Sequence, residues 1–86
     1  MKVSRLKLWT FCIELDSVDI SSPDVPKVYT VNRRGDVWCF GQLGGATTHE
    51  AESLMEVLHI GLMLKHLVPQ VIDKIVELLV EEGVGK

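Results

Sequence analysis

Apolar and polar residues follow two different periods along this chain, and the change of period separates predicted strands from predicted helices. From Trp9 to Leu15 every second residue is apolar, and a second strand-like run extends from Val28 to Phe40. A period of two residues is typical of β-strands. The intervening segment 16–26 is polar and contains two prolines, which favours an exposed loop.

The run from Val28 to Phe40 predicts a β-hairpin. Asn32 to Gly35 suits a type I turn that ends with Gly35 in the left-handed conformation. This turn would pair Val31 with Val37 and would leave an apolar residue set on each face of the hairpin. Because neither set resembles a solvated face, each would need a cover. The two sets are Val28, Thr30, Trp38 and Phe40 on one face, and Tyr29, Val31, Val37 and Cys39 on the other.

The second half of the chain has the spacing of helices. Thr47 or Thr48, followed by Glu50, matches a capping box that would begin a first helix. That helix would run to the residue before Pro69, which either kinks it or starts a second helix. The second helix would cover residues 70–82, where apolar side chains occupy one broad face.

Together these elements predict one α+β domain over residues 1–86. We expect a three-stranded antiparallel sheet, made of a strand, a long loop and a β-hairpin. Two C-terminal helices would follow and pack on one face of that sheet.

The chain carries more apolar surface than one copy of such a domain is expected to bury. It is 47% hydrophobic, and a domain of this size buries only about 60% of its unfolded surface. We therefore expect a small interaction or regulatory protein, acting as a homodimer or in complex with another protein. Aromatic side chains bury a large area at low entropic cost, which makes them good anchors. The candidate interface residues are Trp9, Tyr29, Val31, Val37, Trp38 and Phe40.

Charge and cysteine content narrow the other possibilities. A net charge of −3 argues against a domain built mainly to hold a phosphate backbone. Arg33 and Arg34 nevertheless adjoin at the hairpin tip, so a nucleic-acid-binding module is an alternative function. No uninterrupted apolar run reaches the ~18 residues of a membrane span. Cys12 and Cys39 are too few for a disulfide framework, which favours reduced thiols and a cytoplasmic protein.

Three residues of the predicted first helix are weak candidates for metal binding. Glu52, Glu56 and His59 are spaced so that they share one face of a helix. Glu56-x-x-His59 is the local pattern of carboxylate-bridged metal sites in helical bundles, which also need ligands from facing helices. A solvated polar stripe explains the same spacing. We expect no cofactor and find no nucleophile with a visible base, so catalysis is not expected.

One further pattern resembles a known family. A strand ending at Asp16, a hairpin, a glycine-rich loop and the sequence Thr-Thr-His-Glu-Ala-Glu are similar to the first half of ribonuclease H-like domains, over about residues 9–66. The resemblance implies magnesium ligands at Asp16 and Glu52, with Asp73 as a further candidate, and a metal-dependent nuclease as a second alternative function. Asp16 is followed by Ser17-Val18, which departs from the family's signature, and the chain is too short for the full sheet.

Overall fold

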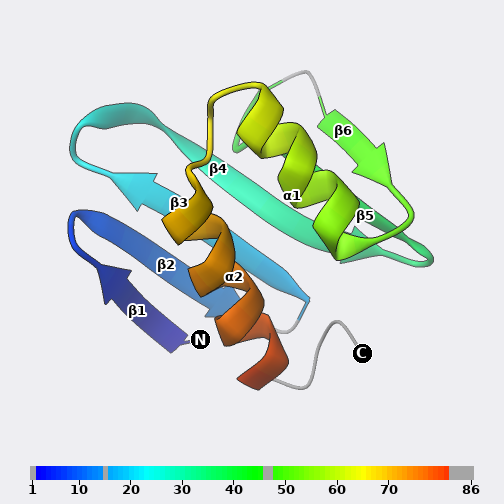
Figure 1. The fold of residues 1–86 in the computed structure, drawn as a ribbon, viewed down its shortest axis with the longest axis horizontal. Helices are drawn as coiled ribbons and strands as arrows, with labels where there is room; N and C mark the ends of the chain where they lie inside the picture. The colour runs from blue at the N-terminus through cyan, green and yellow to red at the C-terminus, as the bar shows by residue number, and fades with distance from the viewer. Residues whose placement is uncertain (1, 15, 46–47, 82–86) are drawn as a thin grey trace.

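Two helices cover one face of a six-stranded antiparallel sheet, and each strand is hydrogen-bonded to the next strand along the chain (Figure 1). The computed structural model describes residues 2–14, 16–45 and 48–81. The elements are β1 (Lys2–Leu6), β2 (Trp9–Glu14), β3 (Ser17–Ser22), β4 (Val25–Arg34), β5 (Val37–Gln42), β6 (Thr48–Ala51), α1 (Leu54–Met63) and α2 (Pro69–Glu81).

The expected three-stranded sheet is therefore wrong, although the arrangement is still α+β. The segment read as a long loop contains β3, in which only Val18 and Ile20 are strongly apolar and serines flank them. Such a short alternation is easily mistaken for a polar loop. At the N-terminus, Leu6 and Leu8 are out of phase with β2 because a turn separates β1 from β2, with Lys7 at φ 55°.

The predicted start of the first helix is also wrong. Thr48 and Glu50 belong to β6, which pairs with β5, and Thr47 lies outside the described residues. The helix begins at Leu54, and the side chain of Ser53 caps it by accepting a hydrogen bond from the Glu56 N–H at 3.2 Å. A Ser cap satisfies one of the free N–H groups of the first turn.

The β4–β5 hairpin has a different register from the predicted one. Its turn is the two-residue sequence Gly35–Asp36, with Gly35 at φ 60°, so that Arg34 pairs with Val37 and Val31 pairs with Phe40. Glycine at the first central position is the pattern of a type II′ turn, which matches the twist of a hairpin. The register places Tyr29, Val31, Trp38 and Phe40 together on the core face, whereas Val28, Val37 and Cys39 lie on the other face with Thr30 and Asn32. The expectation of two apolar faces is therefore wrong.

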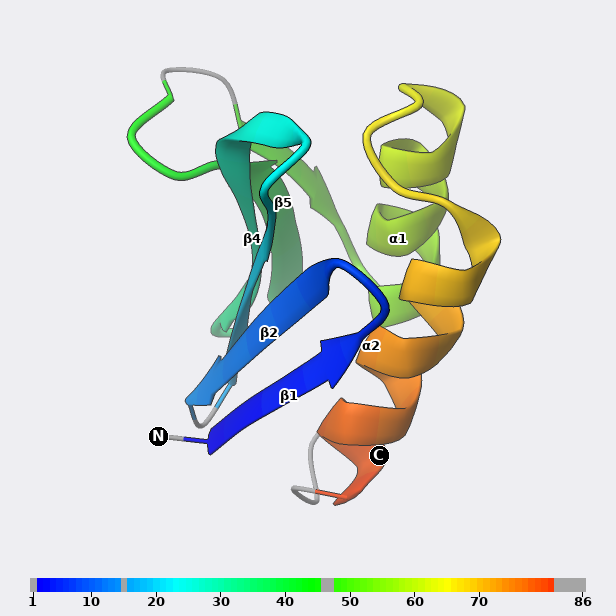
Figure 2. The same ribbon diagram turned by 90° about the vertical axis from the view of Figure 1, so that its left-hand side faces the viewer.

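The apolar face of the sheet and the inner faces of the helices form one core (Figure 2). α1 packs on β5 and β6, while α2 packs on β2. Fully burying an aliphatic or aromatic side chain contributes about 1.5–3 kcal/mol. The buried apolar residues are Phe11, Ile13, Val18, Ile20, Tyr29, Val31, Trp38, Cys39, Phe40, Val57, Leu58, Leu67, Val71, Ile72, Ile75, Leu78 and Leu79.

The connection between the helices depends on a glycine. The N–H groups of His66 and Leu67 both donate to the Gly61 carbonyl, at 3.0 and 3.1 Å. The side chain of Leu67 lies directly on Gly61. A Cβ atom at position 61 would be 2.6 Å from Leu67 Cδ1 and 3.3 Å from Phe40 Cζ. Pro69 then begins α2, as one of the two sequence readings predicted.

We predict that Gly61→Ala destabilises the protein by about 1–3 kcal/mol through overpacking, although alanine favours helices over glycine by about 1 kcal/mol. Urea unfolding measures the change. Truncating Leu67 in the same chain makes room for the new methyl group, so the cost of Gly61→Ala should shrink in a Leu67→Ala background. Equal costs in both backgrounds would contradict the proposed contact.

Candidate functional site

Four of the predicted interface residues lie inside the core. Tyr29, Val31, Trp38 and Phe40 are buried by the chain's own helices and strands. Trp9 and Val37 are only partly exposed. The structure thus uses these aromatic side chains for internal packing, and a partner cannot reach the four buried ones in this conformation.

Tyr29 joins the sheet to the connection between the helices. Its hydroxyl is hydrogen-bonded to His66 Nδ1 at 3.1 Å. The Tyr29 ring also stacks on His66 and Phe40, with centroid distances of 4.9 and 5.7 Å. A buried tyrosine normally finds such a partner for its hydroxyl. The contact gives His66, which lies in the connection between the helices, a structural role.

Arg33 and Arg34 point to opposite faces of the sheet, because neighbouring residues of a strand alternate. The Arg33 guanidinium lies 3.3 Å from Asp16 Oδ2 and 5.8 Å from the centroid of the Trp38 ring. The backbone N–H of Arg33 also donates to the Asp16 carbonyl. Arg34 is exposed on the face away from the helices. The two arginines therefore do not form a common phosphate contact.

The candidate metal ligands do not converge. Asp16 precedes β3 and Glu52 follows β6, so three strand spacings, or roughly 14 Å, separate them. Glu52, Glu56, His59 and Asp73 are all exposed. Within residues 2–14, 16–45 and 48–81, no three His, Cys, Asp or Glu side chains are grouped closely enough to hold a metal ion.

A hollow of about 810 Å³ lies along α1, between residues of β6 and α2. Met55 lies in it with 58% of its surface exposed, beside the part-buried Leu62. Sequence analysis singled out the polar stripe of this helix but missed the apolar residues next to it. We call this region the α1 surface, and its lining residues are Glu50, Ala51, Glu52, Met55, Glu56, His59, Ile60, Leu62 and Ile72.

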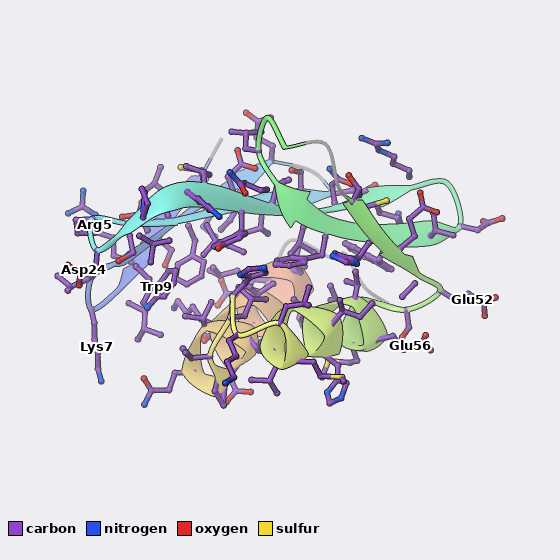
Figure 3. All side chains as sticks on the ribbon, turned by 90° about the horizontal axis from the view of Figure 1, so that it is seen from above. Arg5, Lys7, Trp9, Asp24, Glu52 and Glu56 are labelled. Carbon is purple, nitrogen blue, oxygen red and sulfur yellow. The ribbon has the colours of Figure 1, made fainter. Side chains whose placement is uncertain are left out.

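A second apolar region lies at the other end of the molecule. Val3 and Leu8 are 57% and 58% exposed there, and Arg5 and Lys7 are exposed beside them. Figure 3 shows Arg5, Lys7 and Asp24 at one end of the sheet, where the two basic residues outnumber the one acidic residue, and Glu52 and Glu56 at the opposite end. We call this second region the β1–β2 edge. It consists of Val3 and Arg5 on the face of β1 away from the helices, Lys7 and Leu8 in the turn, and the part-buried Trp9, which packs against the core.

Neither described helix is long and apolar enough to cross a membrane. Comparison with protein-family models, with curated proteins and with solved structures found no match.

Proposed function

We propose that this chain is an interaction protein that associates with a second copy of itself, the α1 surface of one copy packing on the β1–β2 edge of the other. The single observation that carries the proposal is the pairing of exposed apolar residues with opposite charges at the two ends of the molecule. The absence of a membrane-spanning helix among the described residues fits this role, and a cytoplasmic location is part of the proposal.

Apolar burial would supply the attraction. Met55 on one surface and Leu8 on the other each leave more than half of their area exposed, and burying apolar area contributes about 25 cal/mol per Å². Methionine is flexible and adapts to irregular surfaces, which suits a contact of this kind. The hollow on the α1 surface offers room for a side chain of the size of leucine or tryptophan.

Charge would select the unlike pairing. A contact between two α1 surfaces would bring Glu52 and Glu56 of one copy close to the same carboxylates of the other. A contact between two β1–β2 edges would bring Arg5 and Lys7 of both copies together. Like charges at close range repel, whereas unlike surfaces attract and guide association. A two-fold homodimer in which each copy offers both surfaces makes the unlike contact twice.

The alternative functions have less support. A nucleic-acid module would need Arg33 and Arg34 together, but Arg33 is engaged with Asp16 and Trp38. A nuclease would need Asp16 close to Glu52, and they are strands apart. Both alternatives thus lack a group of cooperating side chains within the described ranges.

We predict that Glu52→Lys/Glu56→Lys makes the protein monomeric, as does Arg5→Glu/Lys7→Glu, because each variant sets like charges against each other. Mixing the two variants should restore a heterodimer, since every contact is then again between unlike charges. Light scattering after size exclusion measures the masses at low and high salt, and association should weaken with salt.

Asp36→Lys/Asp73→Lys is the matched control, because it changes the net charge equally at two other exposed positions. It should associate like the unmodified chain. A monomeric unmodified chain at high micromolar concentration and low salt would contradict the proposed function. Two monomeric variants that do not restore each other would contradict the unlike pairing.

We also predict that Met55→Ala weakens self-association roughly tenfold, which corresponds to about 1.4 kcal/mol of lost burial. Met63→Ala is the control, because Met63 is also on α1 and is 70% exposed but does not line the α1 surface. Dissociation constants from analytical ultracentrifugation would compare the two. Equal effects of both substitutions would show that the contact lies elsewhere.

A further inference from the structure

The face of the sheet away from the helices carries a group of four polar side chains on its two central strands. β3 contributes Ser17 and Asp19, and β4 contributes Asn32 and Thr30 directly opposite them. Directly opposite residues on one face have Cβ atoms about 4.5–5.5 Å apart, and diagonal neighbours are also within reach of one ligand. We call these four residues the polar quartet.

The quartet contains hydrogen-bond acceptors that lack donors. Asn32 Oδ1 is buried and has no hydrogen-bond partner. Asp19 is half-buried, and no hydrogen bond or ion pair joins its carboxylate to any other side chain in the described part of the chain. A buried acceptor without a donor costs about 1–3 kcal/mol. The buried Asn32 Oδ1 without a donor, with the half-buried Asp19 carboxylate diagonally across from it, therefore points to a donor from outside the chain.

The quartet lines a hollow of about 370 Å³ rather than an open plane. Beside it, β5 contributes the buried Cys39 and Gly41, which are small and leave space above the strand, and the exposed Gln42 at its end. The chain after β5 turns away from the helices and lies on this side of the sheet (Figures 2 and 3). A turn closed by the Gly45 N–H and the Gln42 carbonyl at 2.8 Å, with Gly44 at φ 78°, forms one wall.

The chemistry of the hollow selects a particular ligand group. A primary ammonium has three N–H donors, no acceptor and a positive charge. It can donate to Asp19, to Asn32 Oδ1 and to a hydroxyl of Ser17 or Thr30. Arg34 lies two residues beyond Asn32 on the same strand and also lines the hollow, where its guanidinium is suited to a carboxylate.

We propose that this hollow binds a small molecule of the amino-acid class, with its ammonium group on the polar quartet and its carboxylate on Arg34. The volume is within the range of small-molecule sites. An anion alone would face the Asp19 carboxylate and the Asn32 carbonyl. A divalent metal ion would find a single carboxylate among the quartet, fewer than calcium sites ordinarily provide.

The experiment is an amide NMR titration of the ¹⁵N-labelled chain with three probes, which are L-lysine, putrescine and acetate. L-lysine should shift the signals of β3, β4 and the Gln42–Gly45 turn, while acetate should not. Asp19→Asn should weaken L-lysine binding roughly tenfold or more, because a charged hydrogen bond is lost. Thr30→Val, which keeps the shape of the side chain, should weaken it less.

Asp36→Asn is the control, since it removes the same charge from the exposed hairpin turn, and it should leave binding unchanged. Arg34→Gln should weaken the binding of L-lysine but not that of putrescine, because putrescine has no carboxylate. If the unmodified chain binds putrescine as tightly as L-lysine, the site belongs to a polyamine instead of an amino acid. No shift with L-lysine or putrescine, or equal shifts in Asp19→Asn, would overturn the proposal. The charge-reversed monomeric variants should bind L-lysine normally, which separates this site from self-association.

Discussion

The register of the sheet is the constraint on which the rest of the structure depends. Every strand pairs with its neighbours along the chain. The register of each pair therefore decides which residues of the next strand share a face with those of the previous one. The turn at Gly35–Asp36 is decisive, because a slip of one residue would send Trp38 and Phe40 to the opposite face. With the observed register, the aromatic side chains and most of the large aliphatic ones of β2 to β5 meet the helices, and the far face keeps Val28, Val37 and Cys39 among small and polar residues.

This separation of the faces decides where the chain can bind other molecules. The apolar face is already filled by α1 and α2, so contacts with another protein are left to the α1 surface and to the sheet end at β1 and β2. The polar face has no helix over it, and its hydroxyl, amide and carboxylate groups suit a small polar ligand. The two proposed activities therefore use separate surfaces, and each can be removed without the other.

Much of the secondary structure follows from the sequence, but its pairing does not. The α+β class, the strand from Trp9, the hairpin and the helix that starts at Pro69 can be predicted from periodicity and turn chemistry. β3 is too polar for the same signals, and β6 is both short and polar. Thr48 with Glu50 also imitates a helix start. Without β3 and the hairpin register, the approach of Asp19 to Asn32 could not be foreseen. Glu56 and His59 are exposed on α1, in line with their helical spacing, whereas Glu52 lies between β6 and the helix.

The placement of α2 over β2 affects how the chain folds during its synthesis. Consecutive strands can pair as soon as each one is made, because all of their partners are local in sequence. The helix that shelters the N-terminal half of the sheet, however, is synthesised after all six described strands. Phe11, Ile13 and Ile20 must then remain in contact with water, or with a chaperone, until the ribosome has released residues 69–81.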